Sequence, residues 1–408
     1  MSAFLAGCGD LPPVRLQLGA GDRPAQYTQA GLIAADEPEA VLAARDVLMA
    51  GGSAADAAAA LGLVLTVTLP SRAGLGGGGA CVHFDARAAK AEVLDFMAPA
   101  AADDVGARFL AAVPAASRGL FALHARYGVM PWPQVVAPAE NLARFGHRVS
   151  RAFALDLKEY SGALVNDRTA LAAFMTPRRQ MLQAGDVLRQ VDLATMLGRL
   201  RARGPGDFYA GTLARDVEDA IAVSGGAVTA ADLRAFVPQW RAAIGVDEGS
   251  ARLFTPSRSI TGGDFGAGEI KPGAAEKAPG ATGFVVADSH GNAVACVLTM
   301  RQIFGLGIMP MGSGFLLAPG PQVAPQHIVP VIGISPTDHH MIYAAAVGGP
   351  NALAQAAIAV RTKQAPADGA GLVNMLVCGG GENATSSRCQ AVNDPRGAGY
   401  ALMLAPKE

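Results

Sequence analysis

The chain has 408 residues, a hydrophobic fraction of 51% and a formal net charge of −1 at pH 7. This length is enough to bury a large core in one or two closely packed domains. Because binding to phosphates requires clustered cations, the balanced charges argue against nucleic acid as the main partner. The longest apolar run, at 59–70, is too short to span a bilayer, which takes about 20 residues, so a transmembrane protein is not expected.

The first 30 residues read as a signal or tether segment. They contain "LAGC", which ends at Cys8 and has the small-residue pattern that precedes a lipidated bacterial cysteine. A signal peptide also needs a basic start and an apolar stretch, and the few residues before Cys8 include no basic one. Two alternatives stay open: a periplasmic protein with a lipid anchor at Cys8 whose true start lies upstream, or a cytoplasmic protein that begins at Met1 and matches by chance.

Helical patterns dominate roughly the next two hundred residues. The segment 37–52 predicts an amphipathic helix that ends at glycine, and Ser53 is a suitable N-cap for a second helix that runs to Pro70. A hairpin pattern follows at 81–96. Further helices are expected on both sides of Gly128 with its Pro-Trp-Pro turn, and then at 191–204, 213–226 and 229–240.

Strands are expected mainly in the last third of the chain. Between about 245 and 280 the composition shifts to Gly, Pro, Ser and Lys with little periodicity, which predicts a loop or linker. The patterns after it predict strands at 282–288, 293–300, 314–318 and 341–347, and a helix at 350–360. The sequence therefore predicts an α+β protein with a mostly antiparallel sheet region and helices packed outside it.

A glycine string at 74–79, "GLGGGG", fits the dinucleotide-binding pattern G-x-G-x-x-G, with Asp95 at a suitable distance downstream. That function needs a helix to begin at the glycines, and a strand pattern follows instead. We therefore interpret the string as a tight turn where the backbone passes close to another element.

No cofactor and no metal are expected. The five cysteines form no C-x-x-C pair, and His339 and His340, as neighbours in a strand, would point to opposite faces. Cys378 and Cys389 either form a disulfide in an oxidising compartment or remain buried free thiols.

Several long stretches resemble the gamma-glutamyltranspeptidase (glutathione hydrolase) family. They include "AGGSAADAAAALG" and "GLGGGGACVHFD" near the start, then "VVADSHGNAVACVLT" and "VGGPNALAQAAIAV". The resemblance covers nearly the whole chain, although family members are longer, with the shortfall at about 245–280. It implies the N-terminal nucleophile hydrolase fold, a four-layer αββα sandwich, in which a large-subunit-like region (31–281) and a small-subunit-like region (282–408) interleave.

The resemblance also implies a mechanism. Family precursors cut their own chain before a threonine, whose freed α-amine, with a pKa of about 8, then acts as base for its own hydroxyl. Thr282 is the candidate nucleophile here, because it is the only threonine or serine at the start of the strand. An ungapped match on "D-x-x-G-N-A-V" nevertheless places Ala281 at the family position. A slip of one residue would correct this, but it would also reverse the side-chain faces.

Other site residues are carried over in the same way. Thr299 matches a family threonine that hydrogen-bonds the nucleophile, and Gly348 and Gly349 match the glycine pair whose N–H groups stabilise an oxyanion. The residues with which the family binds the glutamyl head are mostly replaced. Arg301 stands where the family has asparagine, and Arg301 or Arg72 would have to bind the substrate carboxylate.

The resulting hypothesis is a gamma-glutamyltranspeptidase-like amidohydrolase or transpeptidase. It would process itself before Thr282 into a heterodimer and cleave a small γ-glutamyl or related amide, with altered specificity. The alternative is a catalytically silent family member that binds a ligand or a partner.

Overall fold

The computed structural model describes residues 30–265, 280–322, 328–349, 351–368, 371–379 and 388–405. Within these ranges two large antiparallel sheets lie face to face, and a small two-stranded ribbon consists of β4 (His147–Arg148) and β5 (Val187–Leu188). The predicted α+β class with antiparallel sheets is therefore confirmed.

The first sheet has seven strands, and its order mixes early and late parts of the chain. The strand β1 lies between β15 and β9, and the hairpin of β9 and β10 continues into β2. In spatial order the strands are β15 (Tyr400–Leu404), β1 (Gly31–Ala35), β9 (Gly280–Asp288), β10 (Ala293–Arg301), β2 (Gly78–Asp85), β3 (Lys90–Phe96) and β6 (Gln239–Ala242).

The second sheet has six strands and is built largely from the C-terminal part of the chain. Its spatial order is β14 (Arg388–Val392), β13 (Asn374–Gly379), β12 (Met341–Gly348), β11 (Ile328–Ile334), β8 (Ala251–Thr255) and β7 (Ile244–Glu248).

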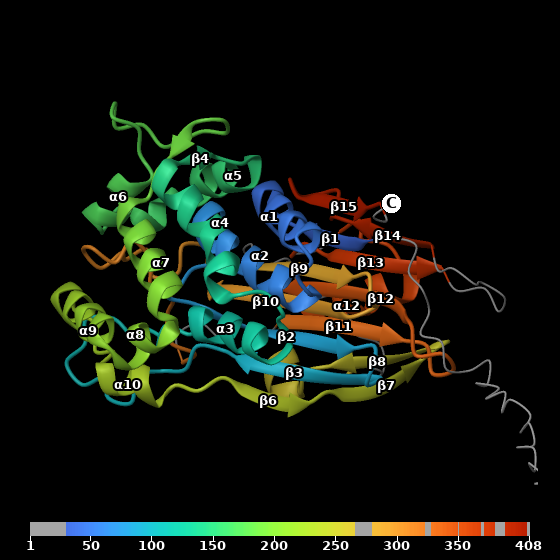
Figure 1. Ribbon diagram of the computed structural model, residues 1–408. Coiled ribbons are helices and arrows are strands. Elements are labelled where there is room, and N and C mark those ends of the chain that lie inside the picture. Colours follow the sequence, from blue (N-terminus) through green and yellow to red (C-terminus); the bar gives the residue numbers. More distant parts are fainter. Residues whose placement is uncertain are drawn as a thin grey trace, which may run out of the picture.

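The helices α1, α2 and α3 contact the outer face of the seven-stranded sheet, and the helices that follow pack mainly against these three or against one another; Figure 1 shows α1 to α4 lying over that face. In chain order these helices are α1 (Pro38–Met49), α2 (Ala54–Thr68), α3 (Ala116–Tyr127), α4 (Trp132–Phe145), α5 (Arg151–Tyr160), α6 (Arg168–Ala173), α7 (Val191–Arg203), α8 (Pro205–Ala210), α9 (Thr212–Ser224) and α10 (Ala230–Ala235), with the 3₁₀ helix η1 (Ser161–Leu164) after α5. Two more, α11 (Arg258–Thr261) and α12 (Ala352–Thr362), contact the six-stranded sheet.

Three apolar cores separate these layers. One lies between the helices and the seven-stranded sheet, and includes Phe284 and Val286 of β9. A second lies between the two sheets, and includes Ala281 and Val285 of the same strand. A third lies beneath α12. Successive side chains of a strand point to opposite faces, so β9 contributes to two cores at once.

The predicted helix starts and stops are confirmed where local capping sets them. Ser53 caps α2 in a capping box with Asp56, and α3 ends before Gly128. The predicted close passage at the glycine string is also confirmed. A Cβ atom on Gly76 would lie 2.2 Å from the carbonyl oxygen of Leu316, and one on Gly79 would lie 2.3 Å from that of Val297. Only glycine allows the backbones to approach this closely.

Three predicted assignments are wrong in whole or in part. The helix expected at 229–240 ends at Ala235, and β6 begins at Gln239. The described part of the supposed linker at 245–280 contains β7, β8 and α11, and Leu253 of β8 is fully buried. A short hairpin at a sheet edge shows only a brief alternation, which the surrounding Gly and Ser obscured. Residues 314–318 form no strand of a sheet, because Gly314 has a φ of +69° and the segment crosses the glycine string through an isolated bridge between Gly76 and Leu317.

Two disulfides connect directly opposed residues on neighbouring strands. Cys378–Cys389 joins β13 to β14, so the first of the two alternatives for this pair is the one observed. Cys81–Cys296 joins β2 to β10 and was not predicted from the sequence. Cys8 lies outside the described residues. In the described ranges, no helix is both long and apolar enough to cross a bilayer.

Candidate functional site

The sequence-predicted site residues gather at one end of the two facing sheets. Ala281 at the start of β9 pairs with Thr299 near the end of β10. Gly348 ends β12, and a Cβ atom placed on it would lie 2.5 Å from the Cβ atom of Ala281. Because residue 348 is glycine, the side chain at position 281 of β9 has room beside it.

Ala281 and Thr282 face different layers. Ala281 belongs to the core between the sheets, which is the side on which Gly348 lies. Thr282 is the register partner of Leu298, and Leu298 belongs to the core under the helices. The structure thus brings Ala281, and not the hydroxyl of Thr282, against the glycine of β12.

The Thr282 hydroxyl has a buried carboxylate partner. It donates a hydrogen bond of 2.7 Å to Oδ2 of Asp36, which follows β1. The side-chain amide of Asn374 on β13 donates to Oδ1 of the same aspartate at 2.6 Å and to the carbonyl of Gly283 at 2.9 Å. This network ties the two sheets together beside the candidate site.

Asp36 is held in an environment that favours its neutral form. Burial raises the pKa of Asp36, and the nearby charge of Arg72 and the hydrogen bonds from Asn374 and Thr282 offset this rise only in part. A carboxyl group with a raised pKa is a stronger base than an ordinary aspartate, which is a property that suits a general base.

Thr299 and Arg301 form a bulge at the end of β10. The register between β9 and β10 shifts between these two residues, and Arg301 has a φ of +64°, which is unusual for a residue other than glycine. The Thr299 hydroxyl donates to the carbonyl of Gly280 at 2.9 Å and accepts from the backbone N–H of Arg301 at 2.8 Å. These two hydrogen bonds of Thr299 therefore stabilise the bulge.

The guanidinium of Arg301 turns towards the segment after β3. Its Nη2 donates to the carbonyl of Ala98 at 3.1 Å, and the side chain is mostly buried. Burial lowers the pKa of Arg301. Strained backbone at a buried cation is a frequent mark of a functional position, so Arg301 remains a candidate for ligand contact.

Arg72 is engaged elsewhere. Its guanidinium forms a two-point hydrogen-bonded ion pair with Asp156 of α5, with both distances at 2.8 Å, and Ser71 donates to the same carboxylate at 2.6 Å. This pair occupies the Nε–Nη2 edge of the guanidinium, one of the edges with which arginine binds a carboxylate at two points. Its role in binding substrate stays a prediction.

Gly349 has a φ of +118° and accepts a hydrogen bond of 3.0 Å from the backbone N–H of Ala352 at the start of α12. Pro350 lies outside the described residues. A positive φ at Gly349 turns the chain sharply from β12 into the helix, as the predicted strand-to-helix turn requires. Its part in an oxyanion site, with that of Gly348, stays a prediction.

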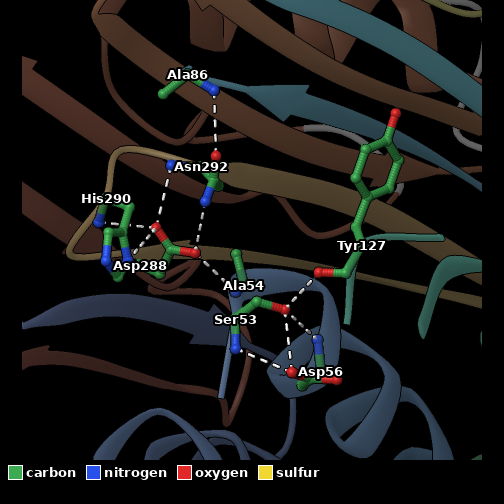
Figure 2. A network of polar contacts seen from close by, with 8 residues as sticks. All are labelled: Ser53, Ala54, Asp56, Ala86, Tyr127, Asp288, His290 and Asn292. Atoms are coloured by element: carbon green, nitrogen blue, oxygen red, sulfur yellow. Dashed lines mark hydrogen bonds and ion pairs between the residues drawn. The ribbon is translucent and has the colours of Figure 1, made fainter. Parts of the chain in front are cut away.

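The far end of the β9–β10 hairpin is anchored to α2, as Figure 2 shows. Asp288 accepts hydrogen bonds from the backbone N–H groups of His290 and Asn292 within the turn, and from that of Ala54 in the first turn of α2 at 3.0 Å. Asn292 in turn accepts from Ala86 at 3.1 Å. The "DSHGN" stretch therefore fixes the hairpin that carries the candidate site.

Sequence reasoning missed Asp36 and Asn374. Asp36 gave a weak signal, as an acid directly after an apolar run, whereas Asn374 gave none. Among the residues that the structure describes, no group of three or more His, Cys, Asp or Glu side chains is arranged to hold a metal ion.

Solved structures with similar folds define the class of this protein. The cephalosporin acylase of Bacillus halodurans superposes with a TM-score of 0.71 over 98% of this chain and 99% of that one. Its sequence identity of 18% is low, so this likeness shows a shared fold and nothing more. The gamma-glutamyltranspeptidase of Helicobacter pylori is 28% identical, with a TM-score of 0.55 over 59% of this chain and 73% of that one. The chain is thus a mixed α+β protein built like these two hydrolase folds.

The sequence comparison is more specific. The profile of the gamma-glutamyltranspeptidase family matches residues 40–267. The glutathione hydrolase proenzyme of Escherichia coli (strain K12) is 32% identical over 250 residues, which make up 57% of this chain and 43% of that protein. The chain belongs to the gamma-glutamyltranspeptidase family, and it spans less than half the length of this curated relative.

Proposed function

We propose that this chain is a family member that binds a γ-glutamyl or related amide but does not cleave it. The observation that carries this proposal is the position of Ala281, whose methyl group faces Gly348 where a nucleophilic oxygen would be needed. A methyl group can neither attack an amide nor be activated by an adjacent amine.

The ligand class follows from family membership and from the cation at the site. Arg301 holds a buried guanidinium beside the start of β9, and the planar guanidinium suits a carboxylate. Its strained backbone supports a role in contact with a ligand. A γ-glutamyl group, which carries a free carboxylate, fits this chemistry.

A second candidate function is the self-processing amidohydrolase or transpeptidase, with Thr282 as nucleophile, Thr299 as its partner, and Gly348 and Gly349 as oxyanion donors. One observation favours it: the hydroxyl of Thr282 lies 2.7 Å from Asp36, a carboxyl group with a raised pKa. Activity would then require the start of β9 to rearrange, because the hydroxyl lies on the opposite face from Gly348.

The mass of the purified chain after reduction and denaturation separates the two functions. A non-cleaving protein gives one species of 41.4 kDa. A protein processed before Thr282 gives fragments of about 28 and 13 kDa, since mass scales with length. The Thr282→Ala variant is the matched control, because loss of the fragments in this variant would establish Thr282 as the nucleophile and overturn our proposal.

Binding is measured in the same preparations. Calorimetry with γ-glutamyl p-nitroanilide is expected to show saturable binding to the native chain, with no release of yellow p-nitroaniline. The Arg301→Gln variant is expected to bind about tenfold more weakly, because it loses one charged contact. Failure of the native chain to bind would remove the proposed ligand.

We further propose two properties of the chain. The first is a periplasmic location. The second is the four-layer αββα architecture of N-terminal nucleophile hydrolases, in which the regions 31–281 and 282–408 fold as one unit. The two disulfides support the first, because disulfides persist in oxidising compartments. The order of helices, sheet, sheet and helix supports the second.

A further inference from the structure

A cavity lies outside the site described above, against the outer face of α5. It has a volume of about 550 Å³, lies between this helix and the segment 181–184, and is open to solvent on one side. The buried face of α5 carries Asp156, which pairs with Arg72. The opposite face of the same helix lines the cavity, with residues at helical spacing at positions 151, 154, 155 and 158. One helix therefore separates the cavity from the core.

The lining of the cavity is apolar in the middle and cationic at both ends. Leu155 and Met181 supply apolar walls, and Leu182 supplies a buried apolar surface. Arg151 and Lys158 are the charged residues of the lining, and both are exposed. Among the described residues neither of these cations forms an ion pair, and no acidic side chain lines the cavity.

The two cations are not equivalent. Arg151 is the first residue of α5, where the helix dipole also favours an anion, although Ser150 already caps the N–H of Phe153. Lys158 lies seven residues further along, which corresponds to about 10 Å of helix. A ligand that satisfies this arrangement has an anionic head at Arg151 and an apolar body that runs past Leu155.

We propose that this cavity binds an amphipathic carboxylate, an organic acid with an extended hydrocarbon body. Charge complementarity with Arg151 selects the anionic head, the more distant Lys158 adds a weaker attraction, and the apolar walls select the body. This inference does not depend on the proposed function, because the residues that line the cavity lie outside the candidate site.

Calorimetry with sodium decanoate as the probe tests the proposal. We expect saturable binding of one decanoate per chain, weakened by added salt because the head contacts exposed cations. Decanol, which has a similar body without the charge, and acetate, which has the charge without the body, are each expected to bind at least about tenfold more weakly.

Variants assign the binding to this cavity. Arg151→Met is expected to weaken decanoate binding about tenfold, and Lys158→Met less, about threefold. Leu155→Asp places an acid between the cations and is expected to abolish binding. Arg168→Met removes a cation exposed on α6 outside the cavity and is the matched control, expected to bind as the native chain does.

All four variants change exposed positions, so far-UV circular dichroism is expected to match that of the native chain. Absence of saturable decanoate binding by the native chain would overturn the proposal. So would equal binding by Arg151→Met and Arg168→Met, or binding of decanol as tight as that of decanoate.

Discussion

Two adjacent buried acids, Asp36 and Glu37, lie directly after β1 beside the candidate site. Glu37 is 1% exposed and is the N-cap residue of α1. Burial raises the pKa of Glu37 to about 8, against the effect of a hydrogen bond with Ser150. Burial raises the pKa of Asp36 as well. At each of these residues the folded chain therefore holds a proton more tightly than the unfolded chain does.

The sign of the resulting pH dependence follows from this difference. Between pH 4.5 and about 8 the folded chain keeps the Glu37 proton while the unfolded chain has lost it, so stability falls as the pH rises. The slope contributed by this residue reaches about 1.4 kcal/mol per pH unit. Urea denaturation at several pH values in this range is expected to show a smaller slope for Glu37→Gln, which cannot ionise. Parallel profiles for the two proteins would contradict the prediction.

Among the elements, the β9–β10 hairpin depends most on contacts at both of its ends. Its open end carries Ala281 and Thr299, and its turn is fixed to α2 through Asp288 (Figure 2). Asp288 is 5% exposed, and its carboxylate accepts from several donors. The position of the candidate site is therefore set partly by a residue at the other end of the strand.

Replacement of that anchor is expected to destabilise the protein. Asp288→Ala leaves one buried donor and several half-buried donors without an acceptor, and we expect a loss of about 3 kcal/mol in the free energy of unfolding. His290→Ala, in the same turn, is the control. Its side chain is 83% exposed, and a change of less than about 0.5 kcal/mol is expected. Similar losses in the two variants, measured by urea denaturation, would show that Asp288 is not the anchor.

The elements that could be predicted are those with local signals. Capping at Ser53 and the stop at Gly128 located helices, and alternation located the hairpin at 81–96. The strands β1 and β11 were not predicted. All of their residues are buried, so neither shows the alternation of a half-exposed strand, and a short apolar run does not distinguish a buried strand from a buried helix segment. Thr282 and Gly348 were predicted through the family resemblance. The contact between Asn374 and Asp36 joins residues 338 positions apart, and no local pattern encodes such a contact.

For the whole molecule, the two disulfides define the covalent state. Cys81–Cys296 spans 215 positions and joins two strands of the seven-stranded sheet, whereas Cys378–Cys389 closes a local hairpin of the other sheet. In the chain-entropy description, the longer loop gives the larger constraint on the unfolded state. We therefore expect the first disulfide to contribute more to stability.

Thiol titration tests this covalent state. The chain has five cysteines, four of which are paired, so the denatured, unreduced protein is expected to show one reactive thiol, that of Cys8, and five after reduction. The Cys8→Ser variant is the control and is expected to show none before reduction. Cys81→Ala with Cys296→Ala is expected to lower the free energy of unfolding by about 2–5 kcal/mol. Three or more thiols in the unreduced native protein would contradict the pairing.

The bridge between β2 and β10 also bears on any backbone break near the start of β9. Cys81 precedes such a break and Cys296 follows it, so the two pieces would stay linked by a sulfur–sulfur bond. On a gel run without thiol, a nicked molecule would migrate as a single band, much like an uncut one. If a processed form exists, its two fragments could not exchange with the fragments of other molecules. Each fragment would stay joined to the one with which it was synthesised.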